Sequence, residues 1–262
     1  MTERARGRPY WWIAYEYLAM VVGLGFLALI CVLWLPFAMI LHRLLPRRWG
    51  QPLGRFMIMA NFRIYLGFLT LCCACRFELS ALDNLRHEGP LIVVANHPSL
   101  LDAVMILSRL PNAVCVMKAG LMDNILFGAA ARLARYIRND ASLNLILDAR
   151  EELREGAQLV IFPEGTRTTK FPVDPFLPTA AVIAARAGTP VQTLCITFSS
   201  PYLGKDWPLF ARPKLPLDIS IRRGRRFAAQ KDAGDLTTRL EQYFRAELGP
   251  SGASTATGAT AS

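Results

Sequence analysis

Histidine is scarce in this sequence, and the three that occur are scattered. His42, His87 and His97 lie far apart, and no group of carboxylates accompanies any of them. A protein metal centre needs three or four ligands of these types gathered at short spacings. We therefore predict no metal site and no bound cofactor.

Cysteine is present but forms no framework. All six cysteines lie in apolar runs, and Cys72 and Cys75 form one C-x-x-C with no second pair or histidine cluster to complete a zinc site. Redox chemistry is one interpretation of this motif, but burial as small apolar side chains is favoured. Unpaired cysteines are typical of a reducing compartment, so we predict an intracellular protein.

Acidic residues are also few, 20 against 30 lysines and arginines, which gives a formal net charge of +10. This excess indicates an anionic partner: nucleic acid, an anionic membrane surface, or an acidic protein or substrate. The chain is 53% hydrophobic and only 19% charged, more apolar than a typical soluble domain. A nucleic-acid binder usually presents a polar, basic face, so the composition favours membrane lipids and argues against nucleic acid.

Two apolar stretches at the N-terminus predict a membrane anchor. Residues 17–41 carry no charge, and this length can cross a hydrocarbon core of about 30 Å. Arginines on both flanks leave the orientation open, and suit a helix, or one bent near Pro36, whose two ends face the cytoplasm. A signal peptide is disfavoured because the run is long and no small-residue cleavage site follows.

The second stretch, residues 56–75, is interrupted by Asn61 and Arg63. A charge at mid-helix is costly in lipid. We therefore expect this helix to lie in the membrane interface or to pack on the first one.

Beyond residue 75 the pattern becomes that of an α/β domain, in which short apolar runs alternate with segments of helical periodicity. Strands are expected at residues 90–95, 113–117, 158–162, 191–198 and 217–227, and helices at 98–110, 121–134, 142–155, 180–187 and 235–248. The predicted fold is a mixed, mostly parallel central sheet flanked by helices.

Three regions follow from this pattern. Residues 1–75 are expected to anchor the chain, and residues 76–248 to form the α/β domain. Residues 249–262 consist almost entirely of Gly, Ala, Ser and Thr, and this composition predicts disorder.

The first chemically informative motif follows the strand predicted at residues 90–95. It reads Asn96-His97-Pro98-Ser99-Leu100-Leu101-Asp102. On one continuous helix His97 and Asp102 would not face each other, but Pro98 excludes its predecessor from helical geometry and favours the first helical position. His97 is therefore expected in the turn, within reach of Asp102, which would leave the other ring nitrogen free as a general base. A buried histidine capped by a nearby acid is the alternative.

A second motif follows the strand predicted at residues 158–162, and it reads Phe162-Pro163-Glu164-Gly165-Thr166-Arg167. Open α/β sheets bind ligands at the carboxyl ends of their strands. Arg167 offers the paired donors that suit phosphate. A surface arginine in a turn is the alternative.

Together, and in this order, the two motifs resemble those of the glycerolipid acyltransferase family, whose members include 1-acylglycerol-3-phosphate acyltransferases. The resemblance implies transfer of an acyl group from a thioester, either acyl-CoA or acyl carrier protein, to a hydroxyl of a lysolipid acceptor. It implies that His97 is the general base, that Asp102 orients it, and that Glu164, Gly165, Thr166 and Arg167 bind the acceptor.

Other positions match the family only loosely. Lys118 and Arg138 are candidate anion-binding groups, although both suit ordinary surface cations equally well. The family's Phe-Lys-x-Gly block is replaced here by Phe176-Leu177-Pro178-Thr179, and Thr193 stands near the place of a family proline. These departures leave the acceptor open: lysophosphatidate, another lysolipid, or a specialised hydroxyl compound.

Several alternatives remain. A covalent mechanism would use Ser99 or Cys115, and is disfavoured. A non-catalytic lipid- or carrier-binding protein and a thioesterase-like hydrolase are the other functional hypotheses. The cluster at residues 222–226, with four arginines, is either a solvated strand edge or a contact for anionic headgroups or for acyl carrier protein. The resemblance places the catalytic domain on the cytoplasmic face of the membrane.

Overall fold

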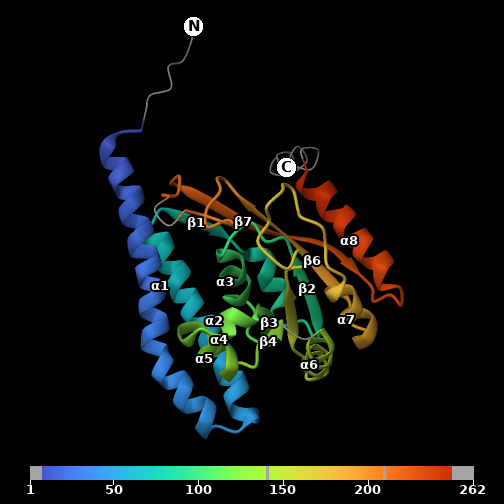
Figure 1. Ribbon diagram of the computed structural model, residues 1–262. Coiled ribbons are helices and arrows are strands. Elements are labelled where there is room, and N and C mark those ends of the chain that lie inside the picture. The colour runs from blue at the N-terminus through green and yellow to red at the C-terminus, as the bar shows by residue number, and fades with distance from the viewer. Residues whose placement is uncertain (1–7, 140–141, 209–210, 250–262) are drawn as a thin grey trace.

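The computed structural model describes residues 8–139, 142–208 and 211–249. Two long helices, α1 (Tyr10–Leu44) and α2 (Arg47–Cys72), lie side by side along one flank of an α/β domain (Figure 1). Both helices are long and apolar enough to cross a membrane, and α1 continues through Pro36. The tail predicted to be disordered lies outside the described residues, except for Gly249.

The two polar residues that interrupt the second apolar stretch face the domain. Nε of Arg63 donates a hydrogen bond to the carbonyl of Ser108 over 2.9 Å, and Asn61 lines an internal cavity described below. α2 therefore packs against protein through the residues that would be costly in lipid. The outer side of α1 remains apolar and exposed, as at Leu18, Val21, Leu33 and Phe37.

The central sheet has seven strands in the order β1-β7-β6-β2-β5-β3-β4. All neighbouring strands are parallel except β6 and β7, so the predicted mixed, mostly parallel sheet is confirmed. The strands are β1 (Cys75–Glu78), β2 (Leu91–Ala95), β3 (Ala113–Lys118), β4 (Ile137–Asn139), β5 (Gln158–Ile161), β6 (Val191–Phe198) and β7 (Leu217–Phe227). The continuous apolar runs of β2 and β5 are fully buried at the centre, as expected of parallel strands covered on both faces.

Helices cover both faces of the sheet. The remaining helices are the 3-10 helix η1 (Ser80–Leu85), α3 (Leu101–Leu107), α4 (Ala119–Asp123), α5 (Ile125–Leu133), α6 (Ser142–Arg154), α7 (Thr179–Ala187) and α8 (Ala233–Leu248). In Figure 1, α7 and α8 lie on the right of the sheet, whereas α3 lies on the left with α2 and then α1 outside it. α5 packs against both α1 and α2 and joins the helical pair to the domain.

The structure corrects several predicted boundaries. α3 begins at Leu101, so Pro98 lies in the preceding turn and not at the first helical position. The helix expected at residues 121–134 is two helices, because the side chain of Asn124 caps α5 by accepting hydrogen bonds from the amides of Leu126 and Phe127. The short elements β1, η1 and β4 had no recognisable periodicity and were not predicted.

Candidate active site

His97 lies in the turn between β2 and α3, as the sequence indicated. Its Nδ1 atom is 2.8 Å from Oδ2 of Asp102, the second residue of α3. The imidazole stacks on Phe162 at a centroid distance of 4.1 Å, and this fixes the plane of the ring. If the carboxylate accepts the proton of Nδ1, Nε2 carries the free lone pair that a general base needs.

Asp102 is completely buried. Its Oδ2 atom also accepts a hydrogen bond from the amide of Ser99, whereas Oδ1 has no partner among the described residues. Burial raises the pKa of Asp102 to about 6, although the hydrogen bond from His97 opposes the shift. The Asp102 carboxyl is therefore ionised at neutral pH but lies close to protonation.

Glu164 ties the two motifs together. Its Oε1 atom accepts hydrogen bonds from the amide of His97 over 3.0 Å and the hydroxyl of Thr168 over 2.9 Å, and Oε2 accepts one from the amide of Asp174. The amide of Thr168 in turn donates to the carbonyl of His97. Burial raises the pKa of Glu164, and these hydrogen bonds oppose the shift. The geometry makes Glu164 a residue that positions the His97 turn.

Arg167 is held by the segment that follows β6. Its Nη1 atom donates to the carbonyls of Leu203 and Gly204 at 3.0 and 2.7 Å. The carbonyl of Leu203 also accepts a hydrogen bond from the amide of Leu100, in the His97 turn. One carbonyl therefore connects both motifs, and Leu203 has a left-handed φ of 51°, a backbone conformation that costs energy for a residue of this type.

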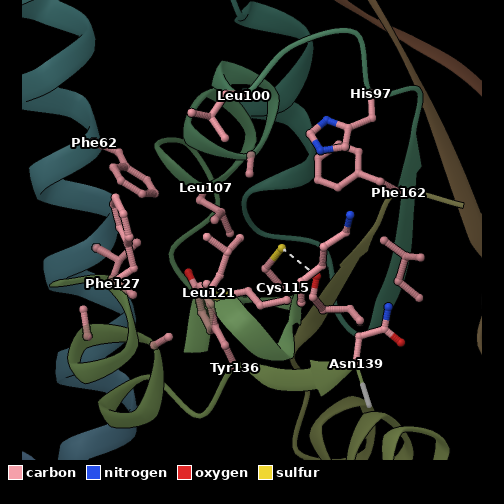
Figure 2. Close-up of a pocket in the computed structure, with 18 of the residues that line it drawn as sticks. Phe62, His97, Leu100, Leu107, Cys115, Leu121, Phe127, Tyr136, Asn139 and Phe162 are labelled. Atoms are coloured by element: carbon pink, nitrogen blue, oxygen red, sulfur yellow. Dashed lines mark hydrogen bonds between the residues drawn. The ribbon is translucent and has the colours of Figure 1, made fainter. Parts of the chain in front are cut away.

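A cavity of about 440 Å³ runs from His97 along β3 to the helical pair. Figure 2 shows His97 and Phe162 at the upper right, Phe62 and Phe127 at the left, and Tyr136 and Asn139 at the bottom. The walls are mainly apolar side chains from α1, α2, α3, α5 and β3. The cavity opens to the surface, because several lining residues are themselves exposed, namely Leu100, Leu121, Phe127 and Leu177.

Five of the predicted site residues line this cavity: His97, Lys118, Gly165, Thr166 and Arg167. Three do not. Asp102 lies behind His97, and Glu164 is buried in its hydrogen-bond network. Arg138 is on β4, where its guanidinium pairs with the carboxylate of Asp123 at 2.6 and 3.0 Å.

Gly165 has a conformational reason to be glycine. Its φ is +68°, and a Cβ atom there would lie 2.7 Å from Cδ1 of Leu177. The turn therefore brings Leu177 into the cavity wall, at the position where the resemblance leads one to expect a lysine.

The two alternative nucleophiles are poorly placed. Ser99 is almost completely buried, and its hydroxyl oxygen accepts a hydrogen bond from the amide of Leu101. Cys115 does line the cavity, but burial raises the pKa of its thiol to about 12, so it stays protonated. Among the described residues, no three His, Cys, Asp or Glu side chains gather as a metal-binding group.

The arginines of residues 222–226 lie on β7, and none of them lines the cavity. Arg223 and Arg226 pair with Glu88, Arg222 approaches Glu247 at 3.9 Å, and the guanidinium of Arg225 lies 5.2 Å from the ring centroid of Phe227. The structure thus gives several of these cations internal partners.

Sequence reasoning missed three contributors to the site. Asn96 pairs its side-chain amide with the backbone of Ile196 at 2.9 and 2.8 Å, which extends the contact between β2 and β6 up to the His97 turn. The segment after β6 and the cavity residue Tyr136 were also missed. Only Asn96, adjacent to the histidine, had a local signal.

Comparisons with known proteins find similarity to acyltransferases. The family model described as Acyltransferase matches residues 76–197. A 1-acyl-sn-glycerol-3-phosphate acyltransferase of Pseudomonas aeruginosa is 26% identical over 73% of this chain and 75% of its own length. A lyso-ornithine lipid O-acyltransferase of the same organism is 30% identical over 52% of this chain and 57% of its own length.

Human 1-acyl-sn-glycerol-3-phosphate acyltransferase beta is 30% identical, and the chain spans about half its length, 49%. Among solved structures, the crystal structure of the acyltransferase PlsC from Thermotoga maritima superimposes with a TM-score of 0.66. The match covers 88% of this chain and 96% of that one at 18% identity, which establishes similarity of fold.

Proposed function

We propose that this protein transfers an acyl chain from a thioester to a hydroxyl of a lysophospholipid such as 1-acylglycerol-3-phosphate, and the match of residues 76–197 to the family model described as Acyltransferase supports this. One observation carries the proposal: the His97–Asp102 pair stands at one end of an apolar cavity that also exposes Arg167 and Lys118. A base, a chain-sized apolar space and two cations are the groups that such a reaction needs.

In this mechanism Nε2 of His97 takes the proton of the acceptor hydroxyl. The oxygen attacks the thioester carbonyl, and the tetrahedral intermediate then expels the thiolate by breaking the carbon–sulfur bond. The thiolate receives the proton from His97, so the base is regenerated. Asp102 holds the ring and stabilises its charged form.

The transient oxyanion needs hydrogen-bond donors, and the structure narrows the choice. In the two turns, the amides of His97, Ser99, Leu100 and Gly165 already donate to protein acceptors. The amides of Thr166 and Arg167, both in the cavity wall, remain the candidates. Arg167 and Lys118 would bind the acceptor phosphate.

Two apolar surfaces support a membrane location for this activity. The exposed side of α1 and the apolar side chains around the cavity opening would both meet lipid. A lysolipid could then reach His97 from the cytoplasmic leaflet without crossing water.

The experiment should also include a second class of acceptor, the lyso-ornithine lipids, because one similar protein is named for such a lipid. In addition, the side chain that lies against Gly165 is Leu177, where the resemblance leads one to expect a lysine. The experiment incubates the purified protein with acyl-CoA or acyl carrier protein thioesters and a panel of lysolipids. Thiol release and product mass are measured.

We expect His97→Ala to lower turnover by about 10²–10⁴-fold. His87→Ala, an exposed histidine outside the cavity, is the matched control and should leave turnover unchanged. Undiminished thiol release by the His97 variant would refute the assigned base. Release without any acceptor would instead indicate a hydrolase.

A further inference from the structure

The cavity wall away from His97 is mainly apolar, but polar side chains interrupt it, among them Asn139 and Trp34, whose indole Nε1 has no hydrogen-bond partner among the described residues. Tyr136, just before β4, and Asn61, on α2, line it together with residues such as Ile58, Phe62 and Phe127. Figure 2 places Tyr136 at the end opposite His97 and Phe62 on the α2 side. Two groups able to form hydrogen bonds therefore stand where a hydrocarbon chain would need none.

The Tyr136 hydroxyl is held in this position without a protein partner. The side chain is only 8% exposed, and its hydroxyl makes no hydrogen bond with any of the described residues. Burial raises the pKa of Tyr136 well above its usual range, so the group is a neutral phenol that can both donate and accept.

Asn61 is the second unpaired group. The other polar residue of this part of α2, Arg63, bonds the carbonyl of Ser108, but the Asn61 amide has no hydrogen-bond partner among the described residues. Its amide offers two donors and one acceptor to the cavity.

Unpaired polar groups are expensive in such a place. Burying a hydroxyl or an amide against hydrocarbon costs free energy unless a hydrogen bond compensates. A saturated acyl chain filling the cavity would displace water from both groups and leave them unpaired. Phenylalanine and leucine would line the same space at lower cost, so the polar atoms call for a ligand with a matching atom.

We propose that the acyl chain accepted by this protein carries an oxygen function, a hydroxyl or a keto group, at a carbon remote from the thioester. Tyr136 and Asn61 are the residues that recognise this oxygen. The inference rests on the proposed function, because it takes the cavity to be the site of the acyl chain. Sites built to bond a substrate hydroxyl discriminate strongly against analogues that lack it.

The test compares acyl thioesters of equal length, one series carrying a hydroxyl on successive carbons and the other unsubstituted. For the best hydroxylated chain we expect kcat/KM to exceed that of the plain chain by at least about tenfold. In Tyr136→Phe and Asn61→Leu, which keep the side-chain shape, this ratio should fall toward one. Equal values for the two series in the unmodified protein would overturn the proposal.

Phe127→Leu is the matched control, since it alters the same cavity without touching a polar group. It should change both rates together and leave their ratio intact. A ratio that falls as much in this variant as in Tyr136→Phe would overturn the assignment to the hydroxyl.

Binding separates this inference from the proposed function. Thermal unfolding is followed with the free fatty acid or its hydroxylated counterpart as the probe. If no thioester is turned over, the proposed reaction fails, but a larger upward Tm shift with the hydroxylated acid, lost in Tyr136→Phe, would still support the recognition site. Equal Tm shifts would contradict it.

Discussion

Buried carboxylates occur both where the helical pair joins the domain and beside His97, and their surroundings differ between these two regions. At the junction, Glu16 of α1 is bound by Arg8, Arg212 and the amide of Leu215. Glu152 of α6 is bound by Arg55, Arg47 and Gln51 of α2. Arginine guanidinium groups thus pair with both carboxylates.

Beside the histidine, Asp102 and Glu164 accept hydrogen bonds from backbone amides, a hydroxyl and His97. Within the described part of the chain, no arginine or lysine pairs with either carboxylate. Burial therefore dominates, and the pKa of each carboxyl rises. At the junction, buried ion pairs hold α1 and α2 against the domain. At the site, the Asp102 carboxyl can still change its protonation state near neutral pH.

Among these variants, Arg55→Leu should cause the largest loss of stability, because it disrupts the contacts between α2 and the domain. Arg55 and Glu152 are each 4% exposed, and Arg55 also bonds Asn112 and the carbonyl of Ala134. Removing one partner leaves a buried charge uncompensated, so we expect a loss of about 3–5 kcal/mol in the free energy of unfolding. Denaturant titration measures this. A double variant, Arg55→Leu with Glu152→Leu, should recover much of the loss, and no recovery would mean that the charge is not the cause.

Asp102→Asn tests whether the raised pKa of Asp102 makes the stability of the protein depend on pH. Because the pKa of Asp102 is about 6 in the folded protein against 3.8 as the reference, the folded state binds the proton more tightly. This group therefore stabilises the fold below about pH 4 and loses that contribution as the pH rises through 6, by about 1–3 kcal/mol. The free energy of unfolding of the unmodified protein, measured relative to Asp102→Asn, should fall across this window.

Activity should follow the opposite trend, because only the charged carboxylate can hold the protonated form of His97. The rate kcat/KM should decline about tenfold per pH unit below pH 6. A rate that stays level down to pH 5 would contradict the role of Asp102.

Arg212→Gln tests whether the junction reaches the site. Arg212 binds Glu16, and the same segment, through Leu203 and Gly204, holds Arg167. We expect the acceptor KM to rise by about threefold to tenfold with little change in kcat, since a displaced Arg167 weakens binding. Arg239→Gln is the control, because it removes a surface ion pair with Asp235 within α8. An unchanged KM together with reduced stability would show that the segment is purely structural.

Arg47→Ala should have the smallest effect. Arg47 also approaches the buried Glu152, but only at 3.4 Å. Its closer pairs, with Glu151 and Glu155, are at the surface, with the Arg47 side chain 36% exposed, and such pairs contribute about 0–1 kcal/mol. Denaturant titration in low and high salt should show a small loss that salt reduces further. A loss as large as that of Arg55→Leu would remove the distinction between buried and exposed pairs.

Individual residues show which features of the fold and of the site could be predicted from the sequence. Pro98 indicated that His97 leaves the strand before the helix begins, and the apolar runs of β2 and β5 identified the strands whose ends carry the motifs. Arg138 could not be judged, because pairing with Asp123 depends on how β4 and α4 meet. Glu164 was assigned to the acceptor, but its oxygens point to amides that are distant in sequence.

The amino-acid sequence alone was enough to predict the alternation of the main strands and helices, the two N-terminal apolar stretches, and the two motifs that resemble those of the glycerolipid acyltransferase family. These features depend on the types of residue and on their spacing over short distances, and both can be read directly from the amino-acid sequence. Which polar side chains have hydrogen-bond partners could be seen only in the folded chain. Asn61 and Arg63 look alike in an apolar run, yet one bonds Ser108 and the other faces the cavity, because helix packing sets what each side chain meets.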